Sequence, residues 1–250
     1  MRLFHTEKKN TEPSAEPSRP FVTAVIVAAG NSTRMGGVNK QKLRIDGVPV
    51  LIRTLRTFSE SPWIDEIAVA AREQDIPDLF AAVKAYGIQK VTDIVKGGAT
   101  RQESVFAAVR RASPNSEFLA IHDGARPLVT EEIIETTVQK AFAENAAATG
   151  VRVKDTIKVV AEDGRILDTP DRSALWAVHT PQVFAKQLYL HAAETVPNSQ
   201  AFTDDCKLME AAGIPVFMVE GSYENIKITT PEDIALAEGI LSGRKEQCFE

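Results

Sequence analysis

The stretch from Val22 to Leu43, VTAVIVAAGNSTRMGGVNKQKL, joins an apolar run to a glycine-dotted basic loop. Such a segment is typical of a buried strand that delivers backbone N–H groups and fixed cations to phosphate oxygens. The spacing after Gly30 matches neither the G-x-G-x-x-G array of dinucleotide-binding proteins nor the Gly-Lys-Ser/Thr ending of a P-loop. Arg34 and Lys40 are therefore candidate phosphate ligands in a loop of another type.

Small and charged residues also follow other apolar runs of the chain, where parallel strands would end. In open α/β sheets, ligands bind just beyond the carboxyl ends of the strands. This criterion selects Gly97, Gly98, Arg101, Ser104, Asp123, Arg126 and Lys227. The set is rich in fixed cations, and the chain contains no serine or cysteine in a nucleophile elbow. It fits phosphoryl or nucleotidyl transfer, because an attacking phosphate is already anionic and requires no general base.

Some of these residues also have an ordinary structural explanation. Asp123 fits a type I turn with Gly124 as well as a site for a metal ion or a substrate hydroxyl. The pair Gly97–Gly98 could simply turn the chain, and Lys227 could be the exposed lysine of an edge strand. The residue types alone leave both explanations open.

The elements that must position these residues alternate along the chain. Short β-branched runs and helical patterns follow one another from Phe21 onward, which predicts a mostly parallel sheet with helices on its faces. Strands are expected at 24–29, 66–71, 91–95, 118–127, 215–221 and 225–230. Helices are expected at 49–60, 76–87, 100–112, 130–146 and 230–243. Thr100 and Glu103 form a candidate capping box, and the apolar run from Phe118 should break at Gly124.

One segment departs from this alternation. Residues 150–170 alternate polar with β-branched side chains around Asp163–Gly164, which predicts a β-hairpin. The hairpin is either a decoration of the sheet edge or an arm that reaches a partner subunit. We expect one domain at 21–243, with a β-arm at about 151–178, a disordered tail at 1–20 and a short tail at 244–250.

Bulk properties exclude several classes of protein. The 250-residue chain has a net charge of -5, which argues against a nucleic-acid-binding protein, because such proteins rely on excess basic charge. Cys206 and Cys248 form neither a disulfide framework nor a zinc pattern, so a reducing, cytoplasmic location is expected. No apolar run approaches the ~18 residues of a membrane span, and the first residues lack the apolar centre of a signal peptide.

Several segments carry a family resemblance, and in chain order they read AVIVAAGNSTRMGGVNKQKL, GGATRQESV, HDGARP, VKDTIK, DRSALWAVHTPQVF, FTDDCKLME and ENIKITTPEDIALAE. They are similar to the motifs of 2-C-methyl-D-erythritol 4-phosphate cytidylyltransferases, enzymes of the non-mevalonate isoprenoid pathway. The similarity extends from Phe21 to Leu241. It implies a Rossmann-like mostly parallel sheet, a homodimer clasped by hairpin arms, CTP as cosubstrate and Mg²⁺ as cofactor.

The resemblance also implies a reaction and a role for individual residues. A polyol phosphate attacks the α-phosphorus of CTP in line, and pyrophosphate leaves. The residues implied to be catalytic are Arg34, Lys40, Arg172 and Lys227. Those implied to bind the nucleotide are Ala28, Ala29, Gly30, Gly97, Gly98, Arg101, Ser104 and Asp123. Those implied to bind the polyol phosphate are Asp123, Arg126, Thr156, Arg172, Thr180, Thr203 and Lys227. Asp123 is also the implied metal ligand, and Thr156 and Arg172 would reach the substrate from the partner subunit.

The chain departs from the family's usual pattern at a few positions. Asn39 stands where proline is common, Lys42 where an aromatic residue is common, and Ala99–Thr100 where an acidic residue often follows the glycine pair. Cys206 in TDDC is similar to the ribitol 5-phosphate cytidylyltransferases, which makes ribitol 5-phosphate the alternative substrate. A non-catalytic CTP sensor is a second alternative, although the expected cations are all present. An NAD-dependent oxidoreductase is disfavoured by the missing glycine array.

Overall fold

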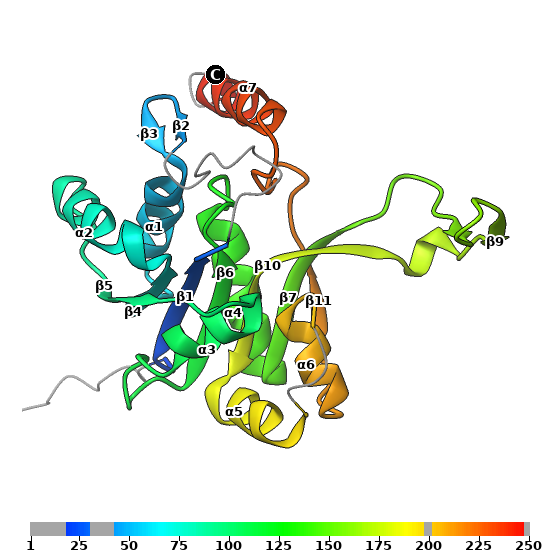
Figure 1. Ribbon diagram of the computed structural model, residues 1–250, viewed down its shortest axis with the longest axis horizontal. Helices are drawn as coiled ribbons and strands as arrows, with labels where there is room; N and C mark the ends of the chain where they lie inside the picture. Colours follow the sequence, from blue (N-terminus) through cyan, green and yellow to red (C-terminus); the bar gives the residue numbers. More distant parts are fainter. Residues whose placement is uncertain (1–18, 31–42, 198–201, 248–250) are drawn as a thin grey trace, which may run out of the picture.

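A central sheet organises the computed structural model, which describes residues 19–30, 43–197 and 202–247. In this part of the chain the sheet has seven strands in the order β11-β7-β10-β6-β1-β4-β5 (Figure 1). Its strands are β1 (Val22–Ala28), β4 (Glu66–Ala71), β5 (Val91–Lys96), β6 (Phe118–Asp123), β7 (Ala146–Arg152), β10 (Trp176–Ala185) and β11 (Phe217–Glu220). Neighbouring strands run parallel except at β10, which is antiparallel to both β6 and β7. The predicted α/β fold with a mostly parallel sheet is confirmed.

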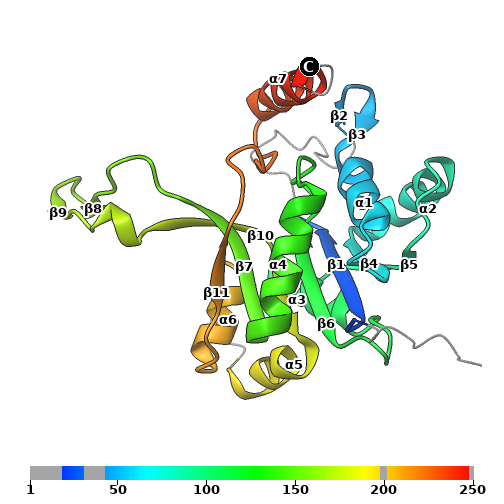
Figure 2. The ribbon, with the colours of Figure 1, turned by 180° about the vertical axis from the view of Figure 1, so that it is seen from behind.

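Helices cover both faces of the sheet, as Figures 1 and 2 show from opposite sides. The helices are α1 (Val50–Glu60), α2 (Ile76–Ala85), α3 (Arg101–Val109), α4 (Glu131–Glu144), α5 (Lys186–Thr195), α6 (Asp205–Ala211) and α7 (Glu232–Gln247). One apolar cluster joins the sheet to α1, α2 and α4, and a second cluster joins it to α3, α5 and α6. The structure therefore has three layers, with the sheet in the middle.

The sequence of β1 explains why this strand lies at the centre. Ala24 and Ile26 face the first cluster, whereas Val25 between them faces the second, as the two-residue period of a strand requires. All three side chains are fully buried. A strand that is covered on both faces reads as a continuous apolar run, which is what made β1 recognisable in the sequence.

The predicted β-arm is confirmed as a protruding segment between β7 and β10 (Figures 1 and 2). Its far part holds a two-stranded sheet of β8 (Val159–Val160) and β9 (Ile166–Asp168), which are antiparallel. Gly164 in the connecting turn has φ +85°, a value that favours glycine. The short 3₁₀ helix η3 (Arg172–Ala174) leads back towards β10.

The C-terminal helix packs on a small separate cluster near the start of α1. The cluster consists of Ile45, Val50, Leu128, Ile228 and Ala237, and its member Ile45 comes from the β2–β3 hairpin (Arg44–Ile45 and Val48–Pro49). A further 3₁₀ helix, η2 (Glu73–Asp75), precedes α2. The cluster ties α7 to the end of the sheet at which β6 finishes.

Several sequence expectations about elements were wrong. Residues 225–230 do not form a strand, because their backbone contacts a loop instead of a neighbouring strand, as in the 2.8 Å bond from Ile228 N–H to the Ala125 carbonyl. The last helix continues past Gly243 to Gln247, so residues 244–247 are helical and not part of a tail. Strands β7 and β10 and helices α5 and α6 were not predicted. β7 was missed because three of its seven residues are alanine and one is glycine, and both residue types carry little β-strand signal.

The expected N-terminal tail falls mostly at 1–18, outside the described residues. Arg19, its penultimate residue, is fixed to the body by an ion pair with Asp65 at 2.7 Å. Residues 248–250 of the expected C-terminal tail also lie outside the described part of the chain. Among the helices that the structure describes, none is long and apolar enough to cross a membrane.

Candidate active site

A cavity lies where the strand order of the sheet reverses. β1 has β4 and then β5 on one side and β6 on the other, so the chain changes sides between β5 and β6. Such a reversal opens a crevice beyond the carboxyl ends of the strands. The cavity here has a volume of about 470 Å³. The predicted site residues that line it are Ala29, Gly30, Gly97, Gly98, Arg101, Ser104, Asp123 and Lys227.

The glycine pair after β5 brings the backbone close to the cavity wall. Gly97 N–H donates to the Ala71 carbonyl at 2.9 Å, and a Cβ at Gly97 would overlap the Ala29 side chain and lie 2.8 Å from Ser104 Oγ. Gly98 N–H donates to the same Ser104 hydroxyl at 3.1 Å. The pair therefore does more than turn the chain, because at Gly97 the packing leaves no room for a side chain.

The capping box that the sequence predicts is formed at the start of α3. Glu103 N–H donates to Thr100 Oγ1 at 3.1 Å, and the Glu103 carboxylate accepts from the N–H groups of Ala99 at 2.6 Å and Thr100 at 3.1 Å. Thr100 and Arg101 line the cavity, so the N-terminus of α3 lies at its wall. The positive end of a helix dipole favours an anion there.

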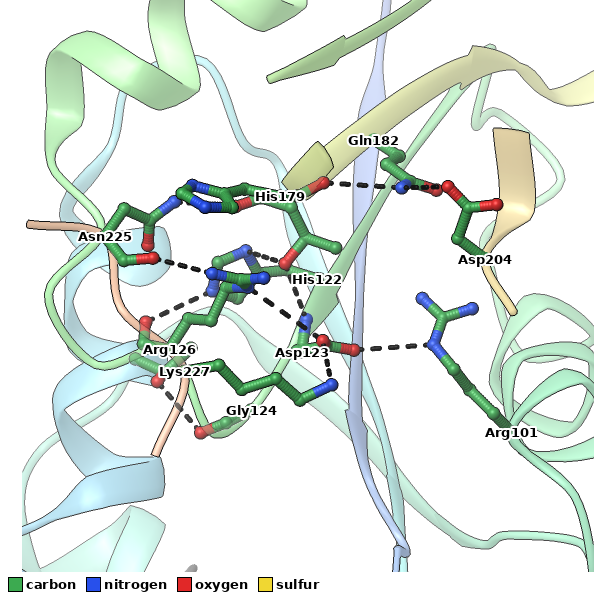
Figure 3. Close-up of polar contacts among 12 residues, drawn as sticks. Arg101, His122, Asp123, Gly124, Arg126, His179, Gln182, Asp204, Asn225 and Lys227 are labelled. Atoms are coloured by element: carbon green, nitrogen blue, oxygen red, sulfur yellow. Dashed lines mark hydrogen bonds and ion pairs between the residues drawn. The ribbon is translucent and has the colours of Figure 1, made fainter. Parts of the chain in front are cut away.

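Asp123, the last residue of β6, stands among three cations (Figure 3). Its Oδ2 accepts from Lys227 Nζ at 2.6 Å and lies 4.0 Å from Arg126 Nε, and its Oδ1 lies 3.5 Å from Arg101 Nε. Burial alone would raise the pKa of Asp123, but the charges of Lys227 and Arg101 outweigh it and hold this pKa well below its usual range. The carboxylate therefore stays ionised throughout the physiological pH range.

Arg101 also pairs with a second buried carboxylate. Its Nη1 donates to Asp205 Oδ2 at 2.6 Å, and Asp205 Oδ1 accepts from the Tyr189 hydroxyl at 2.7 Å. Burial disfavours the charged guanidinium, but Asp205 and Asp123 overcome this and raise the pKa of Arg101. The three cations of the cluster face two carboxylates, and the remaining positive charge suits an anionic ligand.

Arg126 and Thr180 lie behind Asp123 and do not line the cavity. Thr180 is 4% exposed, and its hydroxyl accepts from Asp123 N–H at 3.1 Å. Arg126 is 8% exposed, and its Nη1 donates to the Asn225 carbonyl at 2.7 Å. These contacts connect β6, β10 and the segment that carries Lys227.

Other predicted site residues are placed elsewhere or are not described. Ala28 lines an adjoining apolar pocket, because successive side chains of β1 point to opposite faces. Thr203 is exposed just before α6. Thr156 and Arg172 are exposed on the arm, where Arg172 Nη1 donates to the Lys154 carbonyl at 2.7 Å. The two loop cations, Arg34 and Lys40, lie outside the described residues.

Sequence reasoning missed several buried polar residues that support the cluster. They are His122, Gln182, Asp205 and Asn225. Gln182 Oε1 accepts from Asp205 N–H at 3.0 Å, and Asn225 Nδ2 donates to the Thr180 carbonyl at 3.0 Å. Each of these four residues lies within two positions of a predicted site residue. Their polar side chains at such positions could have indicated them in the sequence.

The donor set fits a Mg²⁺ ion held jointly with a nucleotide. Among the residues that the structure describes, no group of three or more His, Cys, Asp or Glu side chains could hold a metal ion alone. Mg²⁺ often takes only one or two carboxylates, with substrate phosphates and water as its other ligands. Within the described part of the chain, the one ion pair or side-chain hydrogen bond of Asp123 Oδ1 is the long contact to Arg101 at 3.5 Å, which leaves this oxygen able to ligate such an ion.

The strand reversal, the cavity beside a helix N-terminus and the surplus of fixed cations are the features of an α/β protein that binds the phosphates of a nucleotide. The family model described as "2-C-methyl-D-erythritol 4-phosphate cytidylyltransferase" (IspD) matches residues 22–243. The chain belongs to this family of enzymes, so the resemblance found in the sequence is confirmed.

Individual relatives agree with this assignment. The chain is 49% identical over 223 residues to the 2-C-methyl-D-erythritol 4-phosphate cytidylyltransferase of Caldanaerobacter subterraneus subsp. tengcongensis, covering 88% of this chain and 98% of the relative. It is 44% identical to that of Symbiobacterium thermophilum, covering 91% and 95%. The crystal structure of 4-diphosphocytidyl-2C-methyl-D-erythritol synthase from Anaerococcus prevotii is similar with a TM-score of 0.80 and 33% identity, covering 89% of this chain and 96% of that one.

Proposed function

We propose that this enzyme transfers CMP from CTP to 2-C-methyl-D-erythritol 4-phosphate, giving 4-diphosphocytidyl-2-C-methyl-D-erythritol and pyrophosphate. The observation that supports this best is the cluster of Lys227, Arg101 and Arg126 around Asp123, of which Lys227, Arg101 and Asp123 line the cavity together with the glycine pair at 97–98. Membership of the family favours this substrate pair over ribitol 5-phosphate and over a non-catalytic CTP sensor.

The chemistry is a displacement at phosphorus. A phosphate oxygen of the polyol phosphate attacks the α-phosphorus of CTP, the bond from that phosphorus to the bridging oxygen breaks, and pyrophosphate carries away the electron pair. The attacking oxygen is already anionic, so no residue has to remove a proton. Lys227 stabilises the charge that develops around the α-phosphorus, and Arg34 and Lys40 are proposed to do the same from the loop after β1.

Separate parts of the cavity wall account for nucleotide binding. Ala29, Gly30 and the glycine pair at 97–98 approach the cytidine through backbone, and Ser104 and Arg101 complete that wall. Mg²⁺, held by Asp123 together with the triphosphate, supplies charge neutralisation when it is bound. Polyol-phosphate contacts are proposed for Arg126, Thr180, Thr203 and Asp123.

A second copy of the chain is the proposed partner of the arm. Ile166 and Leu167 of β9 are 57% and 58% exposed, and Val160 of β8 is 50% exposed, which is unusual for such apolar side chains. A homodimer would cover them and bring Thr156 and Arg172 of the partner subunit to the substrate. Sedimentation of the chain and of Leu167→Glu tests this, since the variant should be monomeric. A monomeric parent chain would contradict the proposal.

The test of the reaction compares two polyol phosphates side by side. The chain is incubated with CTP, Mg²⁺ and either 2-C-methyl-D-erythritol 4-phosphate or ribitol 5-phosphate, and pyrophosphate release is followed. Fast release with the methylerythritol substrate alone is expected. Faster release with ribitol 5-phosphate would assign the chain to the sister activity, and CTP binding without any release would indicate a sensor. The cytoplasmic location stays a prediction from the cysteine usage.

A further inference from the structure

A buried hydrogen-bonded chain runs behind Asp123 and is centred on His122 (Figure 3). His122 is fully buried at the end of β6, with its ring 4.7 Å from that of Phe58 between centroids. Its Nε2 lies 3.3 Å from the Arg126 carbonyl oxygen, and its Nδ1 lies 3.0 Å from Thr180 Oγ1. The imidazole thus bridges the turn after β6 to strand β10, and the proposed mechanism gives it no role.

The chemistry of the partners fixes the direction of each bond. A carbonyl oxygen can only accept, so the proton of the ring lies on Nε2, which donates to Arg126. The imidazole is fully buried and its two nitrogens face a carbonyl and a hydroxyl rather than a carboxylate, so the contacts fit a neutral ring. Nδ1 is therefore an acceptor, and the Thr180 hydroxyl donates its proton to it.

The orientation of the Thr180 hydroxyl limits what it can offer to a substrate. Its oxygen already accepts from Asp123 N–H at 3.1 Å, and its proton points to His122. One lone pair remains, and a lone pair can accept from a substrate hydroxyl but cannot donate to a phosphate oxygen.

We propose that His122, as the neutral Nε2–H tautomer, is a positioning residue that holds the turn from Asp123 to Arg126 and makes Thr180 an acceptor for a hydroxyl of the polyol. The contact between Thr180 and a polyol hydroxyl rests on the proposed function, because that function supplies the polyol phosphate as substrate. The tautomer part rests on the contacts alone.

The tautomer is tested without any turnover. Histidine ¹⁵N resonances are recorded on the full chain at pH 7.5 and assigned by elimination with the variants His5→Gln, His179→Gln and His191→Gln, which replace the other three histidines of the chain. We expect the His122 signals of an unprotonated Nδ1 and a protonated Nε2. A protonated Nδ1, alone or in an imidazolium, would overturn the inference whether or not the proposed reaction occurs.

The positioning role is tested with two variants that each keep half of the ring's contacts. His122→Asn keeps an acceptor near the position of Nδ1, whereas His122→Gln keeps a donor near the position of Nε2. The KM for the polyol phosphate should rise about five- to tenfold in His122→Gln, as in Thr180→Val, and less in His122→Asn, with the KM for CTP nearly unchanged. The double variant His122→Gln/Thr180→Val should be no worse than either single one.

Two results would contradict this positioning role. Equal rises of KM in His122→Asn and His122→Gln would show that the acceptor at Nδ1 does not matter. Losses that add up in the double variant would show that His122 and Thr180 act independently. Should the His122 variants fail to fold, the resonances of the unmodified ring still decide the tautomer.

Discussion

At the scale of single residues, the site depends on how one carboxylate and its cations share charge. Asp123 is paired with Lys227 at 2.6 Å and with Arg101 at 3.5 Å, and Arg101 is in turn held by Asp205. Arg101 is thus fixed between two carboxylates, whereas Lys227 has a single carboxylate partner among the described residues and is 36% exposed. Lys227 is the cation that a triphosphate can recruit with the least rearrangement.

Replacing Lys227 tests this at the same scale. Lys227→Ala should lower kcat at least ~10²-fold, because charge that develops at the α-phosphorus loses a fixed cation. Lys207→Ala is the matched control, since Lys207 is an exposed lysine on α6 paired with Glu210 at 3.1 Å. Steady-state pyrophosphate release measures both variants. Equal rates for the two would remove Lys227 from the site.

At the scale of elements, the loop between β5 and α3 requires glycine at position 97, because there is no room there for a Cβ. Gly97→Ala would press a Cβ against Ala29 and Ser104, so the loop must move and the KM for CTP should rise. Gly239→Ala in α7 is the opposite case, because a Cβ there meets nothing within 4 Å. That variant should leave the KM unchanged and stabilise the fold by ~0.5–1 kcal/mol. The KM for CTP and the free energy of unfolding in urea are measured for both variants. Equal KM values for Gly97→Ala and Gly239→Ala would contradict the packing argument.

The arm is the second element with a testable consequence. Thr156 is exposed on the arm of its own chain, and the sequence resemblance assigns it to the substrate site of the partner subunit. Thr156→Ala should therefore raise the KM for the polyol phosphate more than the KM for CTP. Equal changes in the two KM values would count against this placement.

At the scale of the whole molecule, buried imidazoles couple folding to pH. Burial lowers the pKa of His122 to about 3 and that of His179 to about 4, both from the usual histidine value of 6.5. Between these values and pH 6.5 the unfolded chain binds protons that the native chain does not, so the free energy of unfolding falls as the pH falls. The slope is about 1.4 kcal/mol per pH unit for each such proton, and less for His179, which is only partly buried.

Urea unfolding at pH 7, 6 and 5 measures this slope. His179→Gln should make it shallower, whereas His191→Gln, at an exposed position of α5, should not change it. Parallel slopes for the parent chain and His179→Gln would contradict the assignment of a proton uptake to His179.

The sequence alone predicted the apolar runs that become the central strands, the capping box at Thr100 and the arm with its turn at Gly164. Each of these features depends on residues that are close together in the sequence. A strand buried on both faces reads as an apolar run, the capping box is a hydrogen-bond exchange between Thr100 and Glu103, and the turn needs a positive φ at Gly164. The sequence also selected Asp123 and Lys227 as candidate site residues. Asp123 ends a strand as expected, and polar groups at the ends of parallel strands meet at one edge of the sheet, whereas Lys227 was selected from a strand that does not form.

Only the tertiary structure decided which of these residues touch. Asp123 and Lys227 are distant in the sequence, and Lys227 lies in a loop that hydrogen-bonds to the turn after β6, so no local pattern could predict their 2.6 Å contact. Asp205 and His122 were missed for the same reason. A buried polar side chain reads like any other in the sequence, and it acquires a partner only when distant segments pack together.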